Sequence, residues 1–335
     1  MELLIGAKLR VGKFTTVHDN NLWVSDVYFT TFADPFTKIT LFPNTTIFTE
    51  TVWDIQDCSY KDAVVFTKAY FFRQVYEHKH YKNLFINDFE TKFTFGFTSS
   101  RNTWTRIMFA KLIEFFNFPN YSYTLSCNGQ VLNPKIIEWL ATDSILMDNN
   151  LKNFLSTPVN IANNQLYSTS NRQDLDNIKK PFVHPKNLLG DLKNLFEKTS
   201  VFLVTESCLG NQTLITEKSI HPVCSLNFPI WPTGYQMVKH WRALGFDTFD
   251  DILDNSYDNY NNMFDRCFSA LANNFKLLND YDFAAETRSN ALDRLKSNRE
   301  LLLSEKFYND YVEDVKTSQY ASDIKQYWLK FVHAE

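Results

Sequence analysis

The segment Val201–Trp231 limits the possible folds more than any other part of the chain. An apolar run ends at Thr205–Ser207, a polar loop leads to Thr216–Lys218, and a second apolar run contains Pro229. This order predicts a strand, a loop, a helix and a second strand, as in an α/β protein with a parallel sheet. In open sheets of that kind, ligands bind where the carboxyl ends of strands meet helix N-termini.

The predicted helix start carries a pair of charges that suggests a ligand. Thr216 can cap the helix, and Glu217 in the first turn suits the positive end of the helix dipole. The same dipole repels Lys218, so a lysine there is favourable when it shares an anion such as phosphate with the free backbone N–H groups. Glu217 would then accept hydrogen bonds from sugar or ribose hydroxyls. The competing interpretation is that both residues are solvated surface charges.

The composition disfavours several classes of protein. With 8 glycines in 335 residues and no GxGxxG or Walker A pattern, the chain lacks the usual phosphate-binding loops. A net charge of −4 gives no broad electrostatic footprint for nucleic acid, although a local basic groove is compatible with it. The 5 cysteines show neither CxxC nor zinc spacing, which predicts free thiols in a reducing compartment.

Neither a signal peptide nor a membrane span is indicated, because the apolar run at the N-terminus is short and no segment reaches spanning length. We therefore expect a cytoplasmic protein. The enrichment in Phe, Asn, Lys and Tyr is typical of AT-rich coding and is compatible with a viral source.

The rest of the chain divides into a strand-rich beginning, an alternating middle and a helical end. The Asn- and Ser-rich residues 149–187 are the best candidate for a long variable connection, and the pattern beyond Tyr257 is almost wholly helical to His333. Thr103 can cap a helix that follows the polar loop 99–102. We predict strands at Leu22–Phe32, Ile39–Phe42, Ala63–Phe66, Lys92–Thr98 and Tyr121–Ser126. We predict further helices at Tyr70–His80, Pro134–Asp148, Leu188–Lys198 and Tyr235–Leu244, the last stopped by Gly245.

Together these segments carry a family likeness. Glu206 and Ser207 followed by Thr216–Lys218 and Pro229 resemble the donor-binding half of the α-1,3-fucosyltransferase family. The loop 99–102 with Arg106 resembles the start of that family's donor domain. Residues 244–258 are similar to a segment of uncharacterised phage and environmental glycosyltransferase-like proteins, which usually have an acid where this chain has Asn255.

The likeness covers residues 92–260 and departs from the family at one point. Leu226–Phe228 replaces the usual small residue and glycine before the closing proline, so the donor pocket would have a different shape.

The resemblance implies a GT-B-like fold, in which two Rossmann-like domains face each other across a cleft. Residues 1–90 would form the acceptor-side domain, 91–260 the donor-binding domain and 261–335 a helical C-terminal segment. The donor would be a nucleoside-diphosphate sugar, and analogy favours an inverting reaction and a guanine nucleotide. The acceptor would be a glycan.

The resemblance also implies roles for single residues. Lys218 and Arg106 would neutralise the diphosphate leaving group, and Arg101 is a second phosphate candidate. Glu217 would bind hydroxyls of the ribose or the donor sugar. The same pocket would be lined by Glu206, Ser207 and Thr216.

Transfer also needs a base that deprotonates the acceptor, and in GT-B-like enzymes it comes from the N-terminal half. We favour His18 and Asp19, because a loop after an early strand tends to face the cleft. The other candidates are Asp26, Glu50, Asp54 and Asp57. Each of them could instead be a surface group.

No metal or cofactor is expected. Asp174 with Asp176 and Asp280 with Asp282 have Asp-x-Asp spacing, but both pairs lie in polar surroundings that are unlike a strand end. Two other functions stay open. One is a non-catalytic carbohydrate-binding or virion structural protein, and the other is a transferase that acts on modified DNA bases.

Overall fold

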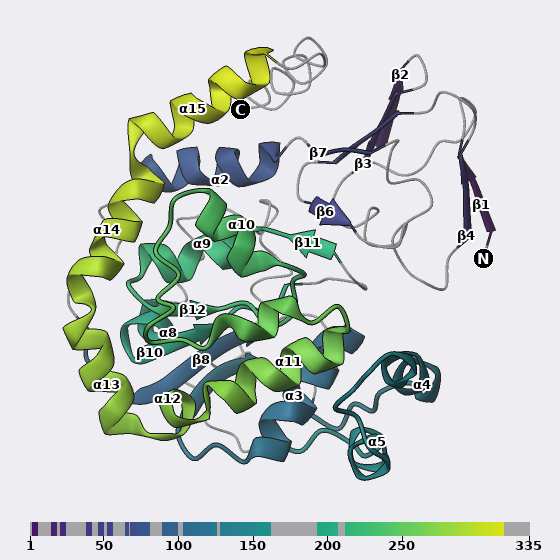
Figure 1. The fold of residues 1–335 in the computed structure, drawn as a ribbon, viewed down its shortest axis with the longest axis vertical. Helices are drawn as coiled ribbons and strands as arrows, with labels where there is room; N and C mark the ends of the chain where they lie inside the picture. Colours follow the sequence, from purple (N-terminus) through teal and green to yellow (C-terminus); the bar gives the residue numbers. More distant parts are fainter. Residues whose placement is uncertain are drawn as a thin grey trace, which may run out of the picture.

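The computed structural model describes residues 68–80, 89–99, 103–125, 128–161, 193–206 and 212–317, and before them the backbone of seven short strands. Its architecture is mixed α/β with a parallel sheet, which confirms the fold class at that level. Figure 1 shows the N-terminal strands on one side of the molecule and the helices of the C-terminal part on the other.

The strand-rich character predicted for the N-terminal part is confirmed. β3, β5 and β7 are parallel neighbours with β2 antiparallel at the edge, and β1 pairs with β4. β3 contains the first residues of the strand predicted from Leu22 to Phe32, and residues 25–32 lie outside the described part. The strands are β1 (Glu2–Ile5), β2 (Thr15–His18), β3 (Asn21–Val24), β4 (Lys38–Leu41), β5 (Thr46–Thr49), β6 (Val52–Ile55) and β7 (Val64–Phe66).

The second sheet has four parallel strands in the order β9-β8-β10-β12. They span Phe93–Ser99 (β8), Tyr121–Leu125 (β9), Thr199–Leu203 (β10) and Phe228–Ile230 (β12). From β8 the chain first adds β9 on one side and later adds β10 and β12 on the other. The strand order therefore reverses between β8 and β10, which makes their carboxyl ends a topological switch point.

Helices surround this sheet. Figure 1 shows α13, α14 and α15 following one another along one side until α15 packs against α2. The helices are α2 (Ala69–His80), α3 (Trp104–Phe116), α4 (Pro134–Thr142), α5 (Asn149–Leu155), α8 (Lys193–Glu197), α9 (Glu217–Cys224), α10 (Met237–Ala243), α11 (Met263–Asn273), α12 (Phe275–Asn279), α13 (Tyr281–Asn290), α14 (Leu292–Leu303) and α15 (Glu305–Thr317), with a 3₁₀ turn η4 (Asn255–Asn259). Most of the predicted helices are confirmed, and among the described residues no helix is long and apolar enough to cross a bilayer.

The helix predicted at Pro134–Asp148 is wrong beyond Thr142. Asp265 from α11 accepts hydrogen bonds from the backbone N–H groups of Ile145 (2.9 Å) and Leu146 (3.2 Å), which removes these donors from a helical ladder. Asp148 then caps α5 by accepting from the N–H of Leu151. The start of the predicted variable connection is thus helical, and its residues from 162 onward lie outside the described part.

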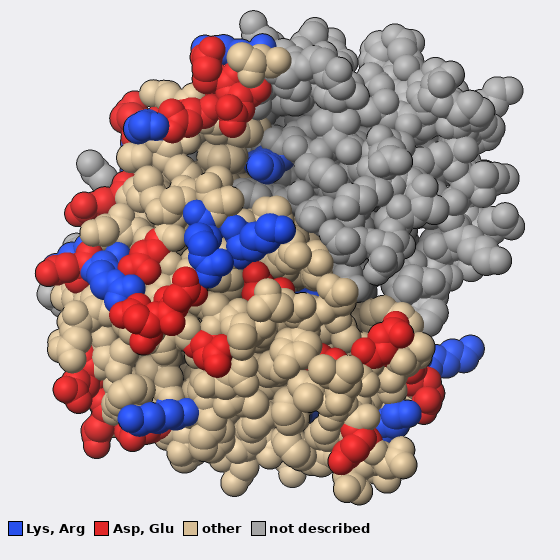
Figure 2. All heavy atoms as spheres, viewed as in Figure 1, with Lys and Arg blue, Asp and Glu red and all other residues tan. Residues whose placement is uncertain are grey.

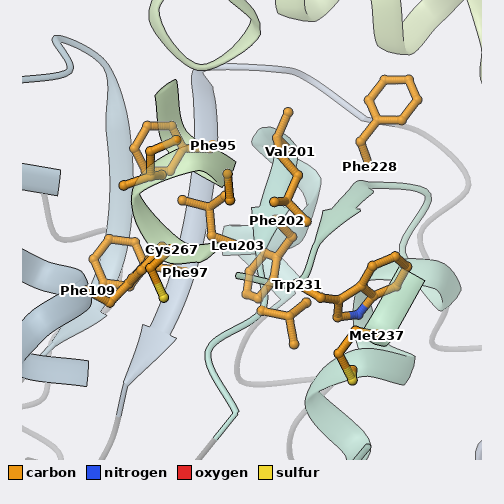
Figure 3. Packing of buried hydrophobic residues seen from close by; sticks show 14 of the residues in the cluster. Phe95, Phe97, Phe109, Val201, Phe202, Leu203, Phe228, Trp231, Met237 and Cys267 are labelled. Carbon is orange, nitrogen blue, oxygen red and sulfur yellow. The ribbon is translucent and has the colours of Figure 1, made fainter. Parts of the chain in front are cut away.

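The core is built on β8 and β10. Phe95 and Phe97 of β8, together with β10, are almost fully inaccessible to solvent, as expected for parallel strands covered on both faces. Figure 3 shows these side chains packed with residues of α3, β12 and α10. The ring of Trp231 stacks on that of Trp241 at 5.3 Å. Many of the aromatic residues thus serve the core.

Arg288 of α13 connects the turn after α9 to β10 through hydrogen bonds. Its guanidinium is fully buried and donates to the carbonyls of Leu226 (2.8 Å), Thr199 (2.8 Å) and Ser225 (3.2 Å). Leu226 has a φ of 58°, in the left-handed region that favours glycine. Leu226, Asn227 and Phe228 are all buried, so this turn is part of the packed core.

Candidate functional site

Two helix starts meet at the switch point. Leu203 of β10 lies opposite Phe97 of β8, so both strands leave the sheet at the same edge. β8 continues towards α3, whose first turn contains Arg106, and β10 continues through Glu206 towards α9. The strand, loop, helix and strand predicted for Val201–Trp231 are confirmed as β10, α9 and β12, with one further short strand, β11 (Gln212–Leu214), in the loop.

Glu206 organises the start of α9. Its carboxylate accepts hydrogen bonds from the N–H (3.0 Å) and hydroxyl (2.8 and 2.9 Å) of Thr216 and from the hydroxyl of Ser219 (3.1 Å). The residue is 1% exposed. Burial raises the pKa of Glu206, and Lys218 opposes that rise. We predicted that Glu206 lines the pocket, whereas the structure places it beneath the helix start, where it acts on Thr216 and Lys218.

Lys218 is the accessible cation of this cluster. Its ammonium lies 3.0 Å from Glu217 Oε1, 3.1 Å from Thr216 Oγ1 and 3.6 Å from Glu206 Oε2, and its side chain is 24% exposed. Burial by itself lowers the pKa of Lys218, but the carboxylates of Glu217 and Glu206 outweigh it and hold that pKa above the ordinary lysine value. The ammonium therefore stays charged at neutral pH.

Arg106 lies close enough to Lys218 to oppose its protonation electrostatically. Arg106 is 2% exposed, so it contributes mainly through its charge. Thr103, the residue before α3, makes no side-chain capping bond, which differs from the predicted cap, and the first turn of α3 contains no acid. The positive end of α3 thus adds to the charges of Arg106 and Lys218.

The remaining predicted site residues fall outside the described part or are placed only by their backbone. Arg101, Ser207 and Asp19 lie outside it, and His18 is the last residue of β2. Among the other proposed bases, Asp54 in β6 pairs with Thr213 of β11, three residues before Thr216. Strand pairing brings the backbone of Asp54 beside the loop that enters α9, which the sequence alone did not indicate.

The residues considered for metal binding and for nucleophilic chemistry can be located only where the structure describes them. No group of three His, Cys, Asp or Glu side chains there could hold a metal ion. Asp280 caps α13 by accepting from the N–H of Phe283, so the Asp-x-Asp pattern of Asp280 and Asp282 belongs to the start of a helix. The other pair, Asp174 and Asp176, lies outside the described part. Cys267 is buried, which raises its pKa to about 12 and makes it a poor nucleophile.

Residues 250–256 and 258 form one wall of a cavity of about 620 Å³ beside α10. The polar residues that surround this cavity mostly form hydrogen bonds or ion pairs with other residues of the protein. Arg242 pairs with Asp250 at 2.9 Å, Tyr257 accepts from the N–H of Trp231 at 3.2 Å, and Asp258 accepts from the N–H of Lys239 at 3.1 Å. These contacts give Arg242, Tyr257 and Asp258 structural roles.

No family model, curated protein or solved structure matches the chain. The functional interpretation therefore depends on the residues and geometry described above.

His221, one turn beyond Lys218, makes the free energy of unfolding depend on pH. The pKa of His221 is lowered from 6.5 to about 3, mainly by burial and also by His78 of α2, whose ring centroid is 5.2 Å away. Because the folded state prefers the neutral imidazole, its stabilising contribution is complete above pH 6.5 and is lost as the pH falls towards 3. This group alone should reduce the free energy of unfolding by about 2 kcal/mol between pH 7 and pH 5.

We expect His221→Leu to remove that part of the pH dependence. Urea unfolding at pH 7, 6 and 5 measures it, and the variant should lose about 2 kcal/mol less than the wild type over this range. Equal losses in both proteins would show that His221 is not buried as a neutral group.

Proposed function

We propose that this protein is a metal-independent, GT-B-like glycosyltransferase that transfers a sugar from a nucleoside diphosphate to a hydroxyl of a glycan. The observation that carries this proposal is the convergence of Lys218 and Arg106, from two separate helix starts, at the switch point between β8 and β10. Two cations and an uncapped helix N-terminus suit a diphosphate.

The residues can be assigned to the steps of transfer. The acceptor oxygen forms a bond to the anomeric carbon while the bond from that carbon to the diphosphate oxygen breaks, which inverts the configuration. Lys218 and Arg106 stabilise the negative charge that collects on the departing diphosphate. Glu217 accepts hydrogen bonds from donor hydroxyls, and a base of the N-terminal part takes the acceptor proton.

The base is His18 with Asp19 in this proposal, and Asp54 is its rival because β6 pairs with β11. Turnover measurements on His18→Ala, Asp19→Asn and Asp54→Asn would decide between them once the donor is known.

The surface favours a glycan over DNA as the acceptor. Figure 2 shows one face of the molecule, and over its described part acidic and basic side chains are interspersed, without an extended cationic track. The whole chain has a net charge of −4. Because binding along a DNA backbone depends on neutralising several phosphates, this distribution suits a less charged acceptor.

A thermal-shift screen against GDP, UDP, CDP, ADP and dTDP, with and without divalent metal, tests the donor site. We expect one nucleotide to stabilise the protein in the absence of metal. At about 100 times its dissociation constant, the ligand should add about 2.7 kcal/mol to the free energy of unfolding. A shift that requires metal would contradict the metal-independent mechanism. Absence of any shift would favour a non-catalytic protein.

A further inference from the structure

Two part-exposed tryptophans lie at the start of α3, the helix that contributes Arg106 to the site. Trp104 is the first residue of α3, two positions before Arg106, and Trp139 comes from α4. Both side chains are partly accessible to solvent, whereas Trp231 and Trp241 are buried in the core. The aromatic pair of Trp104 and Trp139 is therefore not enclosed by the core, and a ligand can reach it.

The two indole rings are held in an edge-to-face arrangement. Their centroids are 5.5 Å apart and their planes meet at 88°, a geometry that aromatic pairs favour. In this geometry Trp139 covers at most one face of Trp104. α4 lies beside α3 (Figure 1) and is tied to α11 by Asn262, whose side chain donates to the carbonyl of Leu140 at 2.8 Å. Trp139 thus restricts the orientation of the Trp104 ring before any ligand binds.

The strand order places this pair on one side of the two cations. Arg106 and Lys218 interact at the crevice between β8 and β10, whereas β9 lies on the other side of β8. Trp104 follows β8, and Trp139 belongs to the next helix after β9. A ligand whose diphosphate is held by the two cations can therefore extend across the end of β8 towards the indole rings.

A nucleoside diphosphate carries the two chemical groups that this arrangement suits. Its phosphates are anionic and match Arg106 and Lys218. Its base is a flat aromatic ring, and such rings stack on the faces of aromatic side chains. The donor hydroxyls are already assigned to Glu217 at the start of α9, so the base is the part of the ligand that the aromatic pair would receive.

We infer that Trp104 is the stacking platform for the base of the nucleotide, and that Trp139 is a positioning residue that holds the Trp104 ring. The ligand class, a nucleoside diphosphate, rests on the proposed function. Every base has a π-face, so stacking strengthens binding without requiring one pattern of hydrogen-bond donors and acceptors. Trp104 therefore contributes affinity for the nucleotide and does not by itself select the base.

Isothermal titration calorimetry at pH 7.5 compares GDP and UDP, which carry a base, with inorganic pyrophosphate, which carries none. Trp104→Ala should bind whichever nucleotide the wild type binds at least about 5-fold more weakly, because the stacking face is removed. The same variant should bind pyrophosphate as the wild type does. Trp104→Phe keeps an aromatic face and should recover most of the loss, whereas Trp104→Leu keeps only apolar bulk and should not.

Two further variants test the roles within the pair. Phe115→Ala is the matched control, because Phe115 is a 43% exposed ring at the other end of α3, and it should change neither affinity. Trp139→Leu should weaken nucleotide binding by a smaller factor than Trp104→Ala and leave pyrophosphate binding unchanged. If Trp104→Ala fails to fold, as judged by circular dichroism, the comparison of Trp104→Phe with Trp104→Leu is the test.

The outcomes distinguish failure of the stacking role from failure of the donor site. If Lys218→Ala weakens nucleotide and pyrophosphate binding, but Trp104→Ala weakens neither or both equally, the stacking role is overturned and the donor site stands. Loss of sugar transfer with unchanged nucleotide affinity would assign the pair to the acceptor and would also overturn it. If the wild type binds neither nucleotide, or Lys218→Ala has no effect, the proposed donor site fails and the stacking role fails with it.

Discussion

Lys218→Ala is expected to reduce nucleotide-sugar turnover by about 10²–10³-fold, because it removes the one accessible cation that we identify at the described switch point. The structural cost should be small. Glu206 retains its bonds from Thr216 and Ser219, and we expect the free energy of unfolding to change by about 1 kcal/mol. Steady-state transfer assays measure the first effect and urea unfolding the second.

Two further variants make this prediction specific. Lys218→Arg keeps the charge and should retain part of the activity, whereas Lys239→Ala removes a lysine from the first turn of another helix, α10, and should leave turnover unchanged. If Lys218→Ala unfolds the protein, or if Lys239→Ala is equally inactive, Lys218 has no special role in binding the diphosphate.

Arg288→Met is expected to destabilise the fold by about 3–5 kcal/mol. The guanidinium is fully buried, and its carbonyl partners belong to α8, to β10 and to the turn between α9 and β12. A methionine of similar length fills the space but donates no hydrogen bond, so these carbonyls lose their donor. The midpoint of urea unfolding measures the effect.

Arg294→Met on the neighbouring helix α14 is the matched control. Arg294 pairs with Asp247 and Asp251 but is 39% exposed in its side chain, so its loss should cost about 1 kcal/mol or less. Arg288→Lys should not rescue stability, since a single ammonium cannot reproduce the planar set of donors. Equal effects at the two positions would show that the Arg288 contacts do not hold the sheet together.

Several features of the site could be read from residue order alone. The helix start at Thr216 was predictable because a capping hydroxyl precedes an acid. Gly245 marked the end of α10 because glycine is favoured just after a helix, and its observed φ of +88° agrees with that preference. Local signals of this kind involve residues within one turn of each other. The role of Glu206 was not predictable in the same way, because its partners lie 10 to 13 residues further along the chain.

The sequence by itself determined the alternation of apolar strands and capped helices, and with it the α/β class and the position of Glu217 and Lys218 at a helix start. These properties depend on side-chain periodicity and on backbone preferences that act over a few residues. Only the tertiary structure decided that β10 lies beside β8, that Arg106 shares an electrostatic field with Lys218, and that Asp265 ends α4. Those outcomes depend on packing between surfaces that lie 100 residues or more apart in the chain. The free energy of burying the whole apolar core determines that packing, and no local pattern does.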